Sequence, residues 1–439
     1  MLAEKIRACC RAGNVTMAML AGGLMLGLAL GGSPTPARAA AVTNAELLQR
    51  MERMEKELKG VKEELRKEKE ARKQAEKASQ AREAKLAKRG GTTVRSGKKN
   101  ISLELSGQVD RAYLYADDGT QTNDFFVDND SSSTRVRFLG RGRFDKDLSV
   151  GTNIEVQIES NTSSGVSQLN NDTGNVGFTQ RKLEFYFDSK RFGRLWLGHG
   201  DTASNFISEQ DLSGVAVSGL FSNLTDQAGG LIFATEMPRP TGQNPISSKN
   251  PTIKKAFKNL DGFSRRDRVR YDTPKVMGFK ASVGAVEGGR SDASLRYASK
   301  LGRFKVASAV GFAHRDHVSN IYAGSVSVLD TSGLNLTFAA GVDDNFNPAR
   351  NNRTFWYVKG GYQFKVFDFG GTAVAFDYYN GTDINVNGDT SDAYGAALVQ
   401  EIDSIATELF VSGRVYGYDQ GGQNFHDIVA VLSGARVKF

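Results

Sequence analysis

Short segments in which every second residue is apolar recur through residues 101–439. The clearest covers residues 148–159, where Leu148, Val150 and Ile154 alternate with Asn153 and Glu155. A period of two places these two sets on opposite faces of a β-strand. The alternation therefore predicts a β-sheet protein in which each strand has one apolar face and one polar face.

Alternation alone fits both a half-buried soluble sandwich and a barrel that spans a membrane. The segments run about ten residues, which is the length that a tilted strand needs to cross a bilayer. Their polar faces also carry many full charges, which a soluble core could not bury unpaired. Both features favour a closed barrel with hydrocarbon outside and water within.

We count sixteen such segments, an even number as in single-chain bacterial barrels, and enough strands to leave an aqueous channel. The predicted strands are residues 101–115, 132–144, 148–159, 177–188, 194–200, 264–272, 279–288, 291–298, 304–314, 320–328, 334–342, 353–364, 370–380, 391–400, 406–418 and 426–439. Short connections (145–147, 189–193, 273–278 and 301–303) alternate with long ones (160–176, 201–263 and 343–352). We expect the short ones to be periplasmic turns and the long ones to point outward.

The N-terminus has the pattern of a secretory signal peptide. The basic residues Lys5 and Arg7 precede a sixteen-residue apolar core, residues 15–30, and the small residues at 37–39 (ARA) suit signal peptidase. We place the signal peptide at residues 1–39. A retained membrane helix is the alternative, but sixteen residues is shorter than the ~20 that span a bilayer. We therefore expect the mature protein to leave the cytoplasm.

Residues 43–89 are predicted to form a periplasmic coiled coil, and residues 90–100 a polar linker. Apolar residues in the helix follow a 4-3-4-3-4 spacing, which is the a/d seam of a coiled coil. The seam residues are Leu47, Met51, Met54, Leu58, Val61 and Leu65. Such a stripe needs partner helices, although a single solvated helix held by Glu–Lys pairs is an alternative.

Charge is unevenly distributed along the chain. The formal net charge is +8, but residues 43–100 carry eighteen basic and ten acidic residues, whereas residues 101–439 have a net charge of −3. A nucleic-acid-binding domain would concentrate positive charge on its folded face, so we expect no nucleic-acid partner. The only cysteines, Cys9 and Cys10, lie in the predicted signal peptide. The mature chain would then lack thiols for disulfides, metal sites or catalysis.

The sequence gives little sign of enzyme chemistry. Its four histidines are His199, His314, His317 and His426. His314 and His317 are a candidate pair of metal ligands, but no further His or Cys lies nearby in sequence. No Ser–His–carboxylate set can be assembled with any specificity. We predict no catalytic residues, no metal and no cofactor.

Five stretches resemble the Gram-negative trimeric porins: SGQVDRAYLY (106–115), STRVRFLGRGRF (133–144), FGRLWLGHG (192–200), RVRYDTP (268–274) and the terminal ARVKF. The resemblance covers residues 101–439. It implies a 16-stranded antiparallel transmembrane β-barrel whose third extracellular loop folds inward, with Phe439 as the insertion signal. It also implies a homotrimer in the outer membrane of a Gram-negative bacterium, in contact with lipid and lipopolysaccharide. The helical extension resembles the periplasmic coiled coil of the sucrose-specific porin.

By the family pattern, residues 201–263 include the inward loop, whose acids would face bases across the pore constriction. The expected basic side is Arg135, Arg137, Arg141, Arg143, Lys182, Arg266, Arg268 and Arg270, and the expected acidic side is Asp201, Glu209, Asp211 and Asp226. The field between them would orient water and dipolar solutes. Alternatively, the arginines form a solvated wall or lie near the lipopolysaccharide rim. His199 stands where the family usually has an arginine at the throat, which would remove a fixed charge.

The leading functional prediction is passive diffusion of small hydrophilic solutes and ions through a trimeric pore. A second possibility within transport is a substrate-specific channel for sugars or organic anions. A structural alternative is that the coiled coil tethers the outer membrane to peptidoglycan, an acidic polymer that its positive charge would attract.

Overall fold

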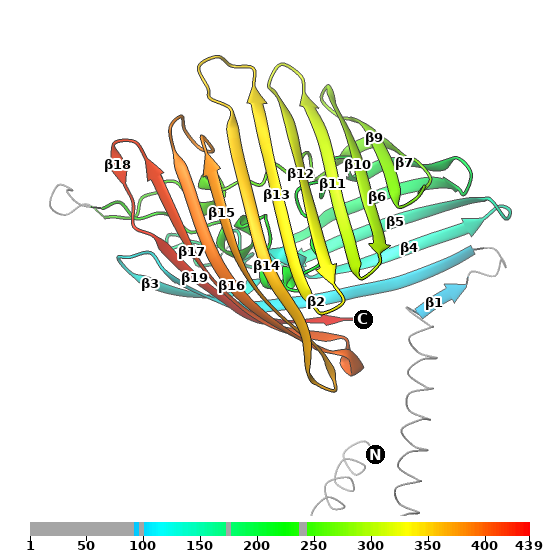
Figure 1. Cartoon of the computed structure of the whole chain (residues 1–439), viewed down its shortest axis with the longest axis horizontal. Helices are drawn as coiled ribbons and strands as arrows, with labels where there is room; N and C mark the ends of the chain where they lie inside the picture. The colour runs from blue at the N-terminus through cyan, green and yellow to red at the C-terminus, as the bar shows by residue number, and fades with distance from the viewer. Residues whose placement is uncertain (1–91, 96–100, 173–176, 237–243) are drawn as a thin grey trace, which may run out of the picture. The chain divides into compact units, whose positions relative to one another are not determined.

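The computed structural model describes residues 92–95, 101–172, 177–236 and 244–439 (Figure 1). The chain divides into two units, and every described residue belongs to the second, residues 89–439. The predicted signal peptide, the coiled-coil seam from Leu47 to Leu65 and most of the linker lie outside the described residues. These assignments stay predictions.

The described chain forms one antiparallel sheet that closes into a barrel of sixteen strands, as predicted. In order around the barrel, the strands are β2 (Ile101–Asp117), β4 (Arg135–Arg143), β5 (Leu148–Glu159), β6 (Gly177–Ser189), β7 (Gly193–Asp201), β8 (Arg265–Asp272), β9 (Phe279–Val286), β10 (Arg290–Leu301), β11 (Phe304–Arg315), β12 (Ser319–Asp330), β13 (Leu334–Asn345), β14 (Arg353–Phe367), β15 (Gly370–Thr382), β16 (Thr390–Ile402), β17 (Thr407–Gln420) and β19 (Ile428–Lys438). Three short strands extend the sheet without adding to the circuit: β1 (Thr92–Arg95), β3 (Thr122–Asp128) and β18 (Gln423–Asn424).

The last strand closes the barrel on the first. Strand β19 pairs with β2 from Val429 opposite Asp117 to Lys438 opposite Gln108. The backbone N–H of Phe439 donates to the Gly107 oxygen at 3.0 Å, and the Gly107 N–H donates back at 2.9 Å. A Cβ at Gly107 would lie 2.5 Å from the Phe439 ring, so glycine is required for this close approach. The role of Phe439 as an insertion signal stays a prediction.

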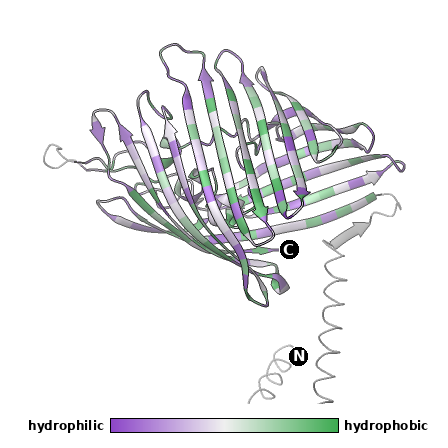
Figure 2. Cartoon of the chain, viewed as in Figure 1, coloured by the Kyte–Doolittle hydropathy of each residue, from purple (hydrophilic) through white to green (hydrophobic). Residues whose placement is uncertain are grey.

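The two faces of the strands meet different surroundings. Large apolar side chains are exposed on the outer face, for example Leu183 at 52% and Leu336 at 61%. Figure 2 shows hydrophobic and hydrophilic residues alternating along the strands. Charged side chains such as Glu155 and Lys359 are buried inside the barrel. Because an exposed apolar band is unfavourable in water, this outer face fits a hydrocarbon surrounding.

The two ends of the barrel carry different connections. One end holds residues 160–176, 202–264 and 346–352, and we call it the long-loop end. The other end, the short-turn end, holds tight connections such as residues 144–147 and 190–192. The strands run antiparallel, so consecutive connections fall alternately at the two ends.

Two connections at the long-loop end are as short as the turns at the other end. Residues 287–289 join β9 to β10, and residues 316–318 join β11 to β12. The predicted alternation of short and long connections is therefore wrong at these two places. The strand ladders continue to the last residues, and Gly288 (φ 73°) and His317 (φ 55°) adopt the left-handed conformation that a tight reversal needs.

Residues 202–264, between β7 and β8, form the inward loop, the third connection at the long-loop end. Its described parts lie inside the barrel, where Figure 1 shows them in green. The described short helices of the chain are η1 (Asp130–Ser132), η2 (Ala216–Ser218), α3 (Thr225–Ala228), α4 (Ile253–Ala256) and η3 (Asp403–Ile405). In the part of the chain that the structure describes, no helix is long and apolar enough to cross a membrane. The prediction of an inward-folded third loop is confirmed.

Apolar residues of the inward loop pack against part of the inner barrel wall. Leu220, Leu224 and Phe257 are buried in one core. The same core includes Leu114 on β2 and Tyr416 on β17, and the rings of Phe257 and Tyr416 are 5.4 Å apart. Some inner positions of these strands are apolar because they face the loop rather than water. The predicted polar inner face is therefore not found at these positions.

Candidate channel constriction

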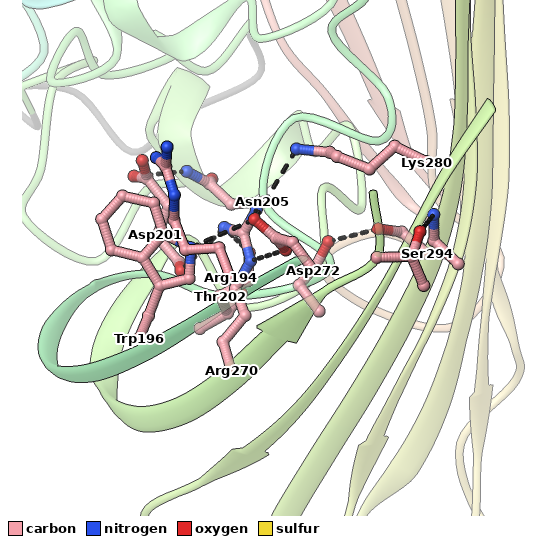
Figure 3. A network of polar contacts seen from close by, with 12 residues as sticks. Arg194, Trp196, Asp201, Thr202, Asn205, Arg270, Asp272, Lys280 and Ser294 are labelled. Carbon is pink, nitrogen blue, oxygen red and sulfur yellow. Dashed lines mark hydrogen bonds and ion pairs between the residues drawn. The ribbon is translucent and has the colours of Figure 1, made fainter. Parts of the chain in front are cut away.

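Two buried arginines hold the start of the inward loop. Arg268 donates to the backbone oxygens of Gly198 and Asp201, each at 3.0 Å. Arg270 donates to the backbone oxygens of Asp201 and Thr202 at 3.1 and 3.2 Å (Figure 3). These arginines are only 6% and 9% exposed and do not line the cavity described below. They position the loop, in contrast to the prediction that they form the basic side of the constriction.

Buried carboxylates balance both arginines. Asp272 accepts a hydrogen bond from Arg270 Nε at 2.7 Å and another from Trp196 Nε1 at 3.1 Å (Figure 3). Glu184 pairs with Arg268. Because each charge has a close partner and further hydrogen bonds, the cluster can be buried without neutralisation.

Two further cations hold the middle of the loop. Lys359 on β14 donates to the Leu220 oxygen at 2.9 Å and pairs with Asp211 at 2.5 Å. Arg414 on β17 donates to the Gly219 oxygen at 3.1 Å. The loop is therefore fastened to the barrel at its middle as well as at its start.

Two of the four predicted acidic residues are neutralised by lysines of the barrel wall. Asp211 pairs with Lys359, and Asp201 pairs with Lys182 at 2.5 Å. Lys182 thus faces an acid of the expected acidic side, but none of these four residues lines the cavity. The remaining two predicted acids, Glu209 and Asp226, do line it.

A cavity of about 710 Å³ lies between the inward loop and the barrel wall near the long-loop end. This volume suits a small organic molecule. Among the described residues that line it, the basic ones are Arg135, Arg181, Lys254, Lys258, Arg265, Arg315 and Arg353, and the acidic ones are Asp130, Glu209, Asp226, Asp261 and Asp343. Seven basic residues therefore surround the cavity with five acidic ones.

On the wall formed by β4, β5 and β6, Arg135 and Arg181 share one carboxylate. Glu155 lies 3.5 Å from Arg135 and 2.8 Å from Arg181. Strict alternation places Lys182 on the inner face of β6 and its neighbour Arg181 on the outer face. A register shift opposite Glu155 and Val156 turns both side chains inward. A bulge of this kind has no periodic signal in the sequence.

On the opposite wall, Arg315 and Arg353 share Asp343, which lies 2.6 and 3.6 Å from them. Sequence reasoning missed both arginines because they lie at strand ends, where alternation gives way to a connection. One carboxylate cannot balance two guanidinium groups. Each wall therefore leaves net positive charge beside the cavity.

Lys254, Lys258 and Arg265 add positive charge from the loop and the start of β8. Carboxylates also act on them: Asp201, Glu155 and Glu209 attract Arg265, and Lys254 attracts Asp130 and Asp226. Burial, together with the neighbouring charges of Lys254 and Arg353, lowers the pKa of Lys258. A lowered pKa is the expected response of an amine to burial and, in addition, to neighbouring positive charge.

Four cavity carboxyls lie outside the barrel strands and are half-buried. Burial raises the pKa of Glu209 to about 7, although Asn259 donates a hydrogen bond to it at 2.7 Å. Burial also raises the pKa of Asp130, Asp226 and Asp261. Loss of water disfavours the charged carboxylate, so the negative charge at neutral pH is smaller than the number of acids suggests. The cavity is therefore more positive than its composition alone indicates.

Beyond the cavity, the inner face of β4 continues as a row of arginines toward the short-turn end. Arg137 pairs with Glu155 at 2.7 Å, while Arg141 and Arg143 are exposed. Residues two apart on a strand are separated by about 6.6 Å along its axis. The row lies on the predicted water face of the strand, but outside the cavity.

Two other predicted constriction residues lie elsewhere. His199 pairs in register with Leu183 and Asp267, and its Nδ1 is 3.5 Å from Asp267 Oδ1. Leu183 is on the outer face, so His199 points away from the lumen and the throat prediction is wrong. Arg266 is exposed but does not line the cavity, where the neighbouring Arg265 takes its place. Arg265 is the first residue of β8, directly after the inward loop, and the register of β7 with β8 runs on unbroken from it.

Comparison with protein families identifies the chain. A model of Gram-negative porins matches residues 78–422, well over half of its length. The chain belongs to the Gram-negative porin family. This porin is accordingly an outer-membrane protein whose barrel forms a diffusion channel. Family and fold point to a channel rather than an enzyme, and the described residues contain no group of three or more His, Cys, Asp or Glu placed to hold a metal ion.

Solved porin structures share this fold at low sequence identity. An anion-selective porin from Comamonas acidovorans aligns with a TM-score of 0.52 and 14% identity, covering 77% of this chain and 100% of that one. OmpT of Vibrio cholerae aligns with a TM-score of 0.50 and 12% identity, covering 80% and 100%. Its trimer form gives the same TM-score and identity, covering 78% and 100%. No curated protein matched this porin.

Proposed function

We propose that this porin prefers small anions and that the cavity is its constriction. The observation that carries the proposal is the composition of the cavity lining, with seven basic and five acidic residues among those described. Burial also reduces the negative charge of the acidic residues at neutral pH, because it raises the pKa of Asp130, Glu209, Asp226 and Asp261. A positive constriction concentrates anions and repels cations. The porin from Comamonas acidovorans that shares the fold is described as anion-selective.

The arginine row of β4 would carry anions onward from the cavity. Arg135 lines the cavity, and Arg137, Arg141 and Arg143 follow on the same strand face. The last two are exposed, so their attraction for an anion is screened by water and salt. Conduction needs sites that are favourable to enter and weak enough to leave.

A reversal potential across a KCl gradient tests the anion preference. The potential of purified channels in planar bilayers should lie toward the chloride equilibrium potential. Lys254→Gln should reduce this preference because Lys254 lines the cavity. The matched control is Lys249→Gln, an exposed lysine of the same loop outside the cavity, which should leave the preference unchanged. A potential at zero or toward the potassium value would refute the proposal.

The proposed assembly is a homotrimer with residues 43–89 in the periplasm and the long-loop end facing the cell exterior. The fold is shared with a trimer form of OmpT. The seam from Leu47 to Leu65 also needs partner helices to cover it. Chemical cross-linking in detergent should give a trimer, and deletion of residues 43–89 should lower the temperature at which it separates. A protein that cross-links only as a monomer would contradict this assembly.

A further inference from the structure

Phe206, at the start of the inward loop, lines the cavity in an unusual conformation. Its φ is 64°, in the left-handed region that bulky residues rarely adopt. The residue is 44% exposed, although it lies inside the barrel. Both the backbone and the exposed ring cost free energy, and strain of this kind persists only where surrounding contacts impose it.

Hydrogen bonds between two arms of the inward loop impose this conformation. Asp261 accepts hydrogen bonds from the backbone N–H groups of Phe206 and Ser208 at 2.6 and 2.7 Å. The side chain of Gln210 donates to the Phe206 oxygen at 2.8 Å. Both peptide groups of Phe206 are therefore fixed, and rotation of the backbone to a relaxed φ would break these bonds.

Three more apolar residues line the same cavity. They are Phe221, Leu260 and Ile321, and all three are buried. We refer to these three residues and Phe206, which all line the cavity, as the apolar shelf; Phe206 is its exposed member. Leu260 also has a positive φ, 47°, so both arms of the loop are strained where they meet the cavity.

The rest of the cavity lining is mainly polar or charged. Lys254, Lys258 and Arg265 bring three basic groups to this lining, where an anion could meet them. A cavity with an apolar surface and a few charged groups fixes the orientation of a ligand that has both kinds of group. An inorganic anion would use the basic residues alone and leave the ring of Phe206 in water.

We infer that Phe206 and the apolar shelf form a subsite for aromatic monocarboxylates. The ring of the solute packs on Phe206 while its carboxylate meets the basic residues of the cavity. The channel therefore holds such anions more tightly than carboxylates of the same charge without a ring. This inference rests on the proposed anion preference and adds the class of solute.

Competition with chloride current tests the subsite. Benzoate and acetate carry the same charge, and only benzoate has a ring. In planar bilayers the wild-type channel should be half-blocked at a lower concentration of benzoate than of acetate. Phe206→Ala should reduce this ratio by about twofold to tenfold, the size of one aromatic contact. Phe206→Tyr should retain the ratio, because it keeps the ring.

Two further variants serve as a replacement for Phe206→Ala and as a control. Phe206→Asn also removes the ring, and asparagine tolerates a positive φ, so it replaces the alanine variant if that protein does not fold. Phe346→Ala is the matched control, since Phe346 is an exposed aromatic residue at the long-loop end that does not line the cavity. It should leave the ratio unchanged.

The outcomes separate this inference from the proposed function. Equal block by benzoate and acetate in the wild type, or an unchanged ratio in both ring-less variants, would overturn the subsite. If the reversal potential of the same channels still lies toward chloride, the anion preference stands without it. A reversal potential without anion preference overturns the proposed function and, with it, the inference.

Discussion

The lumen of this porin has two unlike halves. On β2, β15, β17 and β19 the inner wall is largely apolar, and the inward loop buries Leu220, Leu224 and Phe257 against it. Elsewhere the barrel wall presents charged residues to the cavity, namely Arg135 on β4, Arg181 on β6, Arg315 on β11, Asp343 on β13 and Arg353 at the start of β14. Burial of apolar surface holds the first half together, as in a soluble core. The path of the loop therefore decides which strands keep a water-facing inner side.

Basic residues play different roles in the two halves. In the packed half, Arg414 and Lys359 are fully buried, and each pairs with its own carboxylate and with loop carbonyls. In the open half, Arg315 and Arg353 share a single carboxylate. The number of partners thus distinguishes a cation that holds the structure from one that leaves charge available to solutes.

Arg414→Ala should lower the stability of the barrel more than any other variant proposed here, because it removes a buried ion pair from the packed half. It leaves the buried carboxylate of Asp377 without its partner and removes a hydrogen bond to the Gly219 oxygen. Breaking a buried ion pair in this way costs about 3–5 kcal/mol. The temperature at which the folded band converts to the unfolded band on SDS gels should fall clearly. Lys146→Ala, in an exposed turn, is the control, and equal temperatures for the two variants would contradict the role of Arg414.

A pair of leucine variants compares the two halves with the same chemical change. Leu220→Ala should cost about 2–4 kcal/mol, since Leu220 is fully buried between loop and wall. Leu139 lies among the arginines of β4 and its side chain is only half-buried. Leu139→Ala should therefore lower the free energy of unfolding by about 1 kcal/mol or less. The same gel assay gives the order. If Leu139→Ala were as destabilising as Leu220→Ala, the two halves would not differ in packing.

The barrel could be predicted from the sequence because its signal is local. Each strand meets hydrocarbon on one side, so its alternation can be recognised without knowing its neighbours. The predicted segment 391–400, for example, corresponds to β16 at Thr390–Ile402. Alternation between apolar and polar residues is weaker where the inward loop, rather than water, covers the inner face of a strand. Leu114 and Tyr416 are inner residues of this kind, and both are part of the buried core.

The constriction could be predicted only in part. Alternation assigns Arg135 to the inner face of β4, and Arg135 does line the cavity. The same rule places Arg268 and Arg270 on an inner face, but their partners are carbonyl groups of the loop. The loop follows no periodic pattern, so its contacts, and the cavity residues Lys254 and Arg265, could not be derived from spacing.

The charge of the open half should depend on pH. Burial raises the pKa of Glu209 to about 7, so this carboxyl is mainly charged above that pH and mainly protonated below it. Protonation removes negative charge from the cavity, and chloride preference should therefore increase as the pH falls through roughly 7. The raised pKa values of Asp130, Asp226 and Asp261 act in the same direction.

Reversal potentials at several pH values measure this effect. At high pH, Glu209→Gln should show a chloride preference close to that of the wild type at low pH, with a smaller dependence on pH. Asn244→Ala changes an exposed polar residue of the same loop outside the cavity and should behave as the wild type. A wild-type potential that is constant over this range would show that the buried carboxyls do not control the charge of the open half.

The smallest effect is expected from the arginine row of β4, where charges are exposed rather than paired. Arg141→Gln should lower the single-channel chloride conductance by roughly a fifth at low salt, and the loss should disappear near 1 M salt, because the Debye length shrinks to about 3 Å. Folding temperature should not change, since Arg141 is exposed on the inner face. Arg191→Gln, in the turn of residues 190–192, is the control and should leave conductance unchanged. A loss of conductance that persists at high salt would mean that Arg141 acts through the size of its side chain. The width of the open half, rather than its charge, would then determine the conductance.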